Sequence, residues 1–61
     1  MTSVIIVDDD LFVRTVLAQL LDRAPGIEVL GAFANGADAA EAATTLAPDV
    51  ALVDINMPEV D

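Results

Sequence analysis

The chain has 61 residues, enough for one small domain, and a chain of this size buries only about 60% of its unfolded surface. It contains neither Cys nor His, which excludes disulfides, thiolate or imidazole metal sites, and Ser-His or Cys-His catalytic pairs. The formal charge of -9 disfavours binding to nucleic acids or anionic membranes through this segment. Hydrophobic residues make up 56% of the chain, so we expect it to fold. Its apolar runs are too short to span a membrane. Because no signal-peptide pattern is visible, we expect a cytoplasmic protein.

The first third of the chain predicts a strand followed by a helix. Val4–Val7 is a continuous β-branched run of the kind found in buried parallel strands. Apolar residues then recur at helical spacing, which predicts one buried helix face: Val13, Val16, Leu17, Leu20, Leu21 and Ala24. Asp10 is placed to cap this helix and to pair with Arg14 four residues later, and Pro25-Gly26 ends it.

The remainder predicts a strand, a helix and a strand. Ile27–Phe33 is a strand whose Glu28 and Gly31 indicate an exposed edge. Asn35-Gly36 predicts a turn, with no chemistry of its own, into a helix that Pro48 ends. Small residues on that helix would let it lie close to the sheet, and its predicted face is Ala39, Ala42, Ala43 and Leu46. Val50–Val53 predicts a third, buried strand.

This alternation predicts an α/β fold, in which a βαβαβ unit forms a parallel three-stranded sheet with right-handed crossovers. In such sheets ligands bind beyond the carboxyl ends of the strands. Asp8 and Asp9 follow the first predicted strand and Asp54 follows the third. If those strands are neighbours, the three carboxylates converge, and a divalent cation would relieve their repulsion. Oxygen ligands with room for water and a substrate phosphate suit Mg²⁺.

Three motifs in order resemble the response-regulator receiver family of two-component signalling. They are Val4–Asp10, Gly31–Gly36 and Pro48–Pro58, and the resemblance covers essentially the whole chain. The Gly-x-x-x-Asn-Gly stretch most resembles the subgroup that carries a helix-turn-helix DNA-binding output domain. The resemblance implies half of a flavodoxin-like, doubly wound fold, with residues 1–61 as the N-terminal half of a receiver domain and the later βα units and any output domain absent.

The resemblance also implies roles for individual residues. Asp54 matches the phosphoacceptor, and Asp9 matches the direct metal ligand, with Asp8 acting largely through water. Asn56 matches the position whose backbone carbonyl completes the Mg²⁺ site. The phosphoryl donor would be a histidine of a sensor kinase, and the chain itself would not be an enzyme.

The family domain is about twice as long, and its second half supplies a hydroxyl residue and a lysine that contact the phosphoryl group. This chain has no lysine, because its two basic residues are Arg14 and Arg23. Simpler interpretations apply to some positions: Asp10 as a helix cap, Asn56 as a turn residue, and Met57 and Pro58 as structural residues beside the acceptor.

Two other functions remain open at this point. One is a non-signalling interaction or dimerisation module that has kept the receiver fold. The other is a Mg²⁺-dependent aspartyl-phosphate phosphatase or phosphotransferase, since Asp54-x-Asn56 faintly resembles the Asp-x-Asp of haloacid-dehalogenase-like enzymes. Finally, Val50–Val53 would be a strand edge without charge or proline, which predicts self-association as a homodimer.

Overall fold

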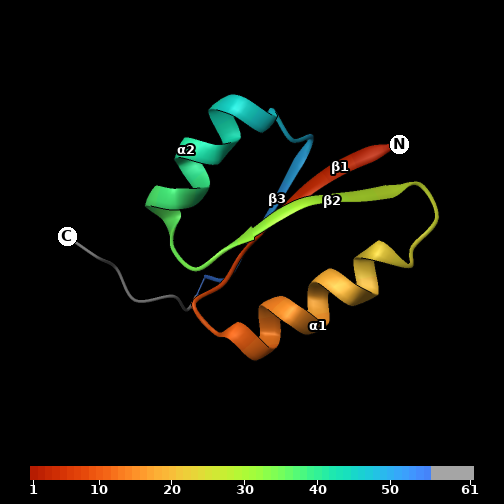
Figure 1. The fold of residues 1–61 in the computed structure, drawn as a ribbon, viewed down its shortest axis with the longest axis horizontal. Coiled ribbons are helices and arrows are strands. Elements are labelled where there is room, and N and C mark those ends of the chain that lie inside the picture. Colours follow the sequence, from red (N-terminus) through yellow and green to blue (C-terminus); the bar gives the residue numbers. More distant parts are fainter. Residues whose placement is uncertain (56–61) are drawn as a thin grey trace.

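The computed structural model describes residues 1–55, and it contains five elements that alternate between strand and helix (Figure 1). These are β1 (Thr2–Val7), α1 (Leu11–Asp22), β2 (Ile27–Phe33), α2 (Gly36–Leu46) and β3 (Val50–Val53). The strands form one parallel sheet in the order β2-β1-β3. The predicted α/β class, the parallel sheet and the edge position of β2 are therefore confirmed.

Local side-chain hydrogen bonds set where each helix begins. The Asp10 carboxylate accepts from the backbone N–H of Phe12 at 2.8 Å and of Val13 at 3.2 Å, as an N-cap should. The Asn35 side chain caps α2 in the same way, accepting from the N–H of Asp38 at 2.8 Å. The predicted Asp10 cap is confirmed, and the predicted turn into the second helix at Asn35-Gly36 is confirmed as well, with Asn35 as its N-cap.

Ends of the helices also follow local rules. After α1 the chain turns through Gly26, whose φ of 80° lies in the left-handed region that glycine adopts without steric cost. After α2, Ala47 takes the same left-handed conformation, with φ of 47°, and its N–H donates to the carbonyl of Ala43. This C-cap comes just before Pro48, the residue predicted to end the helix.

The two helices lie on opposite faces of the sheet and leave β1 at the centre (Figure 1). Val4, Ile5, Ile6 and Val7 are 0–4% exposed, because β1 is flanked by strands on both edges and covered on both faces. Ile5 and Val7 pack with Ala39 of α2 in the core. Ala39 is only 6% exposed, which confirms that its small side chain lets α2 approach the sheet closely.

The predicted buried face of α1 is wrong at two positions. Val16 is 37% exposed and Leu20 is 60% exposed, and with Phe12 they form an apolar stripe along one flank of the helix. The helix packs against β2 and β1 only, so the flank directed away from these strands has nothing to cover it among residues 1–55. Leu46, predicted on the buried face of α2, is likewise 39% exposed.

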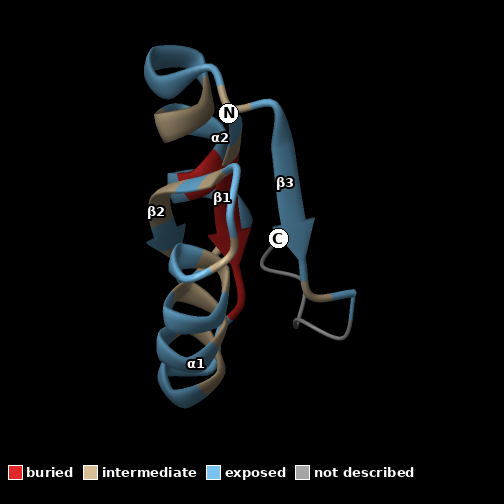
Figure 2. Cartoon of the chain, turned by 90° about the vertical axis from the view of Figure 1, so that its right-hand side faces the viewer, coloured by how far each residue is buried: buried red, intermediate tan, exposed pale blue. Residues whose placement is uncertain are grey.

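The prediction that β3 is buried is also wrong. All four of its residues are exposed, and Figure 2 shows β3 standing clear of both helices. Within residues 1–55 it contacts β1 and no other element. An apolar run shows that a strand can be buried, but burial itself depends on whether other elements lie over it.

Candidate functional site: an acidic cluster at the ends of two strands

The site lies where β1 and β3 end side by side. Their register pairs Val7 with Val53, so the residues that follow, Asp8 and Asp54, leave the sheet at the same level. Backbone hydrogen bonds extend the pairing into this region. The N–H of Asp54 donates to the carbonyl of Val7 at 2.9 Å, and the N–H of Asp8 donates to the carbonyl of Phe33 at 3.0 Å. The sheet therefore fixes the backbone that carries two of the three acids.

The three predicted acids do converge. One carboxylate oxygen from each of Asp8, Asp9 and Asp54 can be chosen such that all three lie within 4.8 Å of one another. Asp8 is buried at 7% exposure, Asp54 is half-buried and Asp9 is exposed. The sequence predicted the convergence, whereas the order of burial depends on the path of the chain after β1.

A short network holds the segment after β1 in place. The Asp8 Oδ1 atom accepts the N–H of Asp10 at 2.9 Å, and the Asp8 carbonyl accepts from Arg14 Nη1 at 2.8 Å. Arg14 therefore bridges α1 to the backbone of the site, where the sequence had indicated pairing with the Asp10 side chain. Asp10 is occupied in capping α1, so its carboxylate serves the fold.

Electrostatics make this cluster suited to a cation. Two unit charges 4.8 Å apart repel by roughly 1 kcal/mol in water and roughly 3 kcal/mol near a protein surface. A divalent cation converts that repulsion into attraction, and carboxylate oxygens are the ligands that Mg²⁺ prefers. The carboxylate oxygens of these three aspartates therefore fit Mg²⁺. Asn56, predicted to add a backbone carbonyl, lies outside the described residues, as do Met57 and Pro58.

Sequence reasoning missed a second aspartate that the fold fixes tightly. At the opposite end of β3, Asp49 Oδ2 accepts from the Ser3 N–H at 2.8 Å and from the Ser3 hydroxyl at 3.0 Å. In return the Asp49 N–H donates to the Ser3 Oγ and carbonyl oxygens, at 2.9 and 3.0 Å. The Ser3 backbone N–H, and then its hydroxyl, lower the pKa of Asp49. No local pattern predicts this pair, because its members lie 46 residues apart.

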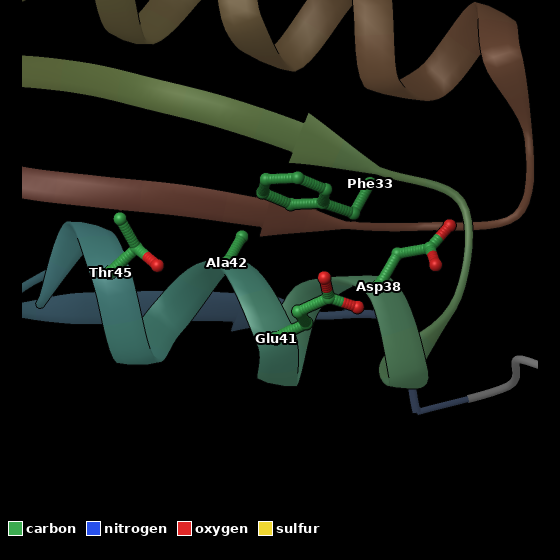
Figure 3. Close-up of a pocket in the computed structure, with 5 residues that line it drawn as sticks. All are labelled: Phe33, Asp38, Glu41, Ala42 and Thr45. Atoms are coloured by element: carbon green, nitrogen blue, oxygen red, sulfur yellow. The ribbon is translucent and has the colours of Figure 1, made fainter.

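A shallow hollow of about 380 Å³ lies between the end of β2 and α2 (Figure 3). The Phe33 ring and Ala42 line it, together with Asp38, Glu41 and Thr45. It contains none of the three acids of the strand-end cluster. We therefore treat the hollow as separate from the site.

Comparison with known proteins assigns the family. The response regulator receiver domain family matches residues 4–61, which is nearly the whole chain. The chain belongs to that family. Membership makes it a segment of a phosphoacceptor module of two-component signalling, and the partial receiver fold predicted from sequence agrees with it.

Similar proteins carry one recurrent name. The receiver segment is 48% identical over 58 residues to a protein-glutamate methylesterase/protein-glutamine glutaminase of Carboxydothermus hydrogenoformans, covering 95% of this chain and 16% of that protein. It is 49% identical over 61 residues to a protein of the same name from Geobacter metallireducens, which covers 100% of this chain and 18% of that protein. A Halobacterium salinarum protein of the same name is 44% identical over 61 residues, which covers 100% of this chain and 17% of that protein.

The receiver segment thus spans about a sixth of the length of these relatives. None of the helices in residues 1–55 is long and apolar enough to cross a membrane.

Proposed function

We propose that Asp54 accepts a phosphoryl group from a phosphohistidine of a sensor kinase. The observation that supports this most directly is the convergence of Asp8, Asp9 and Asp54 at the carboxyl end of the sheet. Ligands of open parallel sheets bind at that end. Asp54 is half-buried, which leaves its carboxylate approachable while the β1–β3 pairing fixes its backbone.

In this reaction a carboxylate oxygen of Asp54 attacks phosphorus, and the new O–P bond gives an acyl phosphate. The P–N bond to the donor breaks at the same time, and the leaving imidazole nitrogen keeps the electron pair of that bond. The chain supplies the nucleophile and its orientation, because attack and departure must be roughly in line. Since the chain receives the group and does not turn over a metabolite, we assign it a phosphoacceptor role without enzyme activity of its own.

The three acids would hold Mg²⁺, with Asp9 and Asp54 as direct ligands and Asp8 acting largely through water. When bound, the cation neutralises charge on the transferred phosphoryl oxygens. Asp8 suits an outer position, because it is buried and its Oδ1 atom already accepts the Asp10 N–H. Asp9 is exposed and can adjust its carboxylate to the cation. The backbone carbonyl of Asn56 would complete the set.

Two arms of one experiment test the assignment. A complete receiver domain containing this segment is incubated with Mg²⁺ and a small phosphodonor, and its intact mass is recorded for wild type and Asp54→Asn. We expect a mass gain of one phosphoryl group that Asp54→Asn loses. Retention of that gain in Asp54→Asn would contradict the assignment. The 61-residue chain should give a low yield, because it has no lysine to contact the acyl phosphate.

The output that phosphorylation controls is a separate proposal. The relatives compared above are named protein-glutamate methylesterases, which favours an esterase output acting on protein glutamate methyl esters. The helix-turn-helix output that the Gly31–Gly36 motif suggests stays a prediction. Esterase activity that rises on phosphorylation of the complete protein would support the esterase output. Phosphorylation-dependent DNA binding would support the helix-turn-helix output.

The two alternative functions that the sequence leaves open would give different results in biochemical assays. A non-signalling module would bind metal but accept no phosphoryl group, even in a complete receiver domain. A phosphatase or phosphotransferase would instead turn over a phosphorylated metabolite. The family match favours the phosphoacceptor over both.

A further inference from the structure

Arg14 reaches back from the first turn of α1 to the carboxyl end of β1. Its Nη1 atom donates to the carbonyl oxygen of Asp8, six residues earlier in the chain, at 2.8 Å. Arg14 is half-buried, whereas Arg23, the only other basic residue of the chain, is exposed at the far end of the same helix. One of the two cationic side chains is therefore bonded to the backbone beside the acidic cluster.

The carbonyl that Arg14 contacts belongs to the peptide unit between Asp8 and Asp9. A peptide unit is planar, so a bond to its oxygen also fixes the direction in which the chain enters Asp9. The rest of Asp8 is held separately, because its N–H donates to the Phe33 carbonyl at 3.0 Å and its Oδ1 atom accepts from Asp10 at 2.9 Å. Arg14 thus acts on the part of this segment that leads to Asp9, the exposed acid of the cluster.

The chemistry of arginine suits this contact. The guanidinium group is planar and always charged in proteins, so its bond to the carbonyl is charge-assisted and stronger than a bond between neutral groups. The Asp10 carboxylate lies four residues before Arg14, a spacing that favours an ion pair, but it caps α1 instead. A bond to a carbonyl orients the backbone itself, which an ion pair with a side chain would not do.

We propose that Arg14 is a positioning residue for the cation site, because it holds the Asp8–Asp9 peptide in the orientation that directs Asp9 to the other two acids. This inference rests on the proposed function, since it takes the three acids to hold a divalent cation. Arg14 itself contacts neither the cation nor the phosphoryl group. Without its bond the peptide is freer to rotate, and ordering Asp9 when a cation binds then costs affinity.

Charge and positioning make opposite predictions for the loss of Arg14. If only its charge matters, removing a positive group beside the site should tighten the binding of a cation, because like charges repel. If its bond to Asp8 positions the acids, removing that bond should weaken cation binding. Residues that orient metal ligands typically contribute about 10–100-fold to metal affinity, so we expect the positioning effect to prevail.

Titration calorimetry with Mn²⁺, on a complete receiver domain containing this segment, measures the sign of the effect. Arg14→Met keeps the apolar stem of the side chain without its donors or charge, and should weaken Mn²⁺ binding about tenfold. Arg14→Lys keeps the charge without the planar fork, and should weaken binding by only about threefold.

Arg23→Met is the matched control, because it makes the same substitution at the other end of the same helix. The two arginines lie about 14 Å apart along the helix axis, at about 1.5 Å per residue. That distance exceeds the screening length of about 8 Å at physiological ionic strength, so Arg23→Met should stay within about twofold of wild type. Weakening in Arg23→Met equal to that in Arg14→Met would overturn the proposal.

A bond that only stabilised the fold would give a different result. Arg14→Met would then lower Tm, while the folded domain bound Mn²⁺ with unchanged affinity. Circular dichroism finds the temperature at which each variant is fully folded, and titration at that temperature reports the affinity of the folded form alone. Unchanged or tighter Mn²⁺ binding by folded Arg14→Met would overturn the proposal. If Arg14→Met does not fold, Arg14→Lys binding as tightly as wild type would do so.

Phosphorylation by a small phosphodonor gives a second readout. The backbone of Asp54 is fixed by its bond to Val7, so the nucleophile stays in place once the site is saturated with Mg²⁺. In Arg14→Met the Mg²⁺ concentration for half-maximal phosphorylation should therefore rise about tenfold, while the rate at saturating Mg²⁺ stays within about threefold of wild type. A lower saturated rate with unchanged Mg²⁺ dependence would overturn the proposal.

Failure of the proposed function would be visible in the wild-type domain. A wild type that neither binds Mn²⁺ nor gains a phosphoryl group would overturn the cation site and the role of Arg14 together. A wild type that does both, with Arg14→Met indistinguishable from it in each measurement, would overturn the role of Arg14 alone.

Discussion

The two ends of β3 each carry an aspartate, and the surroundings of the two carboxylates differ sharply. Asp49, before the strand, accepts the N–H and hydroxyl of Ser3 on β1. Asp54, after the strand, lies with Asp8 and Asp9, so negative charges face one another. The donors around Asp49 stabilise its ionised form, whereas the like charges around Asp54 are relieved by a cation.

This difference shows how one residue type serves the fold at one end of a strand and chemistry at the other. The Ser3–Asp49 pair joins the start of β3 to the start of β1, 46 residues away in sequence. The same two strands then deliver Asp8 and Asp54 to a common level at their other end. Pairing at the Asp49 end thus helps to set the register on which the acidic site depends.

The largest expected effect is on phosphoryl incorporation, which should depend on Asp54 and not on Asp49. In a complete receiver domain, Asp54→Asn should abolish phosphoryl incorporation and Asp49→Asn should retain it, because only Asp54 lies in the acidic cluster. Intact mass after treatment with a phosphodonor and Mg²⁺ measures both. Loss of incorporation in Asp49→Asn, with the fold preserved by circular dichroism, would show that Asp49 also takes part in phosphoryl transfer.

Substituting an acid of the strand-end cluster should lower metal affinity by about tenfold or more, whereas substituting an acid outside it should not. Even residues that only hydrogen-bond to a metal ligand typically contribute 10–100-fold to metal affinity. Asp9→Asn removes an expected direct ligand and should weaken Mn²⁺ binding by that amount. Asp38→Asn, an exposed acid on α2 outside the cluster, is the matched control. Titration calorimetry or paramagnetic broadening measures the affinities. Unchanged binding in Asp9→Asn would remove the metal assignment.

Stability without metal should change in opposite directions at the two ends. Asp54→Asn removes like-charge repulsion and should stabilise the chain by about 1 kcal/mol, or a rise in Tm of about 4–8 °C. Asp49→Asn weakens the hydrogen bonds to Ser3 and should lower Tm. Thermal melts at one fixed protein concentration, with chelator present, measure both, because self-association would otherwise shift Tm. Shifts of the same sign would show that repulsion at the acidic cluster is negligible.

The smallest expected effect is a pH dependence from Asp49. Because the folded-state pKa of Asp49 is lowered below 3.8, the Ser3–Asp49 pair stabilises the fold above that pH. This stabilisation is lost as the pH falls through the folded-state pKa. Ser3→Ala removes the hydroxyl donor and should make stability fall less steeply below about pH 4. Denaturation curves between about pH 2 and 6 measure the slope, and identical slopes in both proteins would refute the role of the pair.

The sequence by itself determined the elements and the chemistry of their ends. Alternation of apolar runs with helical spacing predicted all five elements, since each pattern lies within one element. Asp10 predicted the start of α1 because a capping side chain bonds to a backbone N–H two or three residues away, and the Asn35-Gly36 turn signal predicted the start of α2. The acids at the ends of β1 and β3 predicted a cation site, because neighbouring parallel strands end at the same edge of a sheet.

Only the tertiary structure decided which apolar residues are covered and which distant residues meet. Val16, Leu20 and β3 are apolar but exposed, because within residues 1–55 the two helices pack only against β1 and β2. The Ser3–Asp49 pair likewise depends on the parallel register of β1 and β3. Burial and long-range pairing arise from how complete elements are placed against one another, and no local pattern in the sequence records that placement.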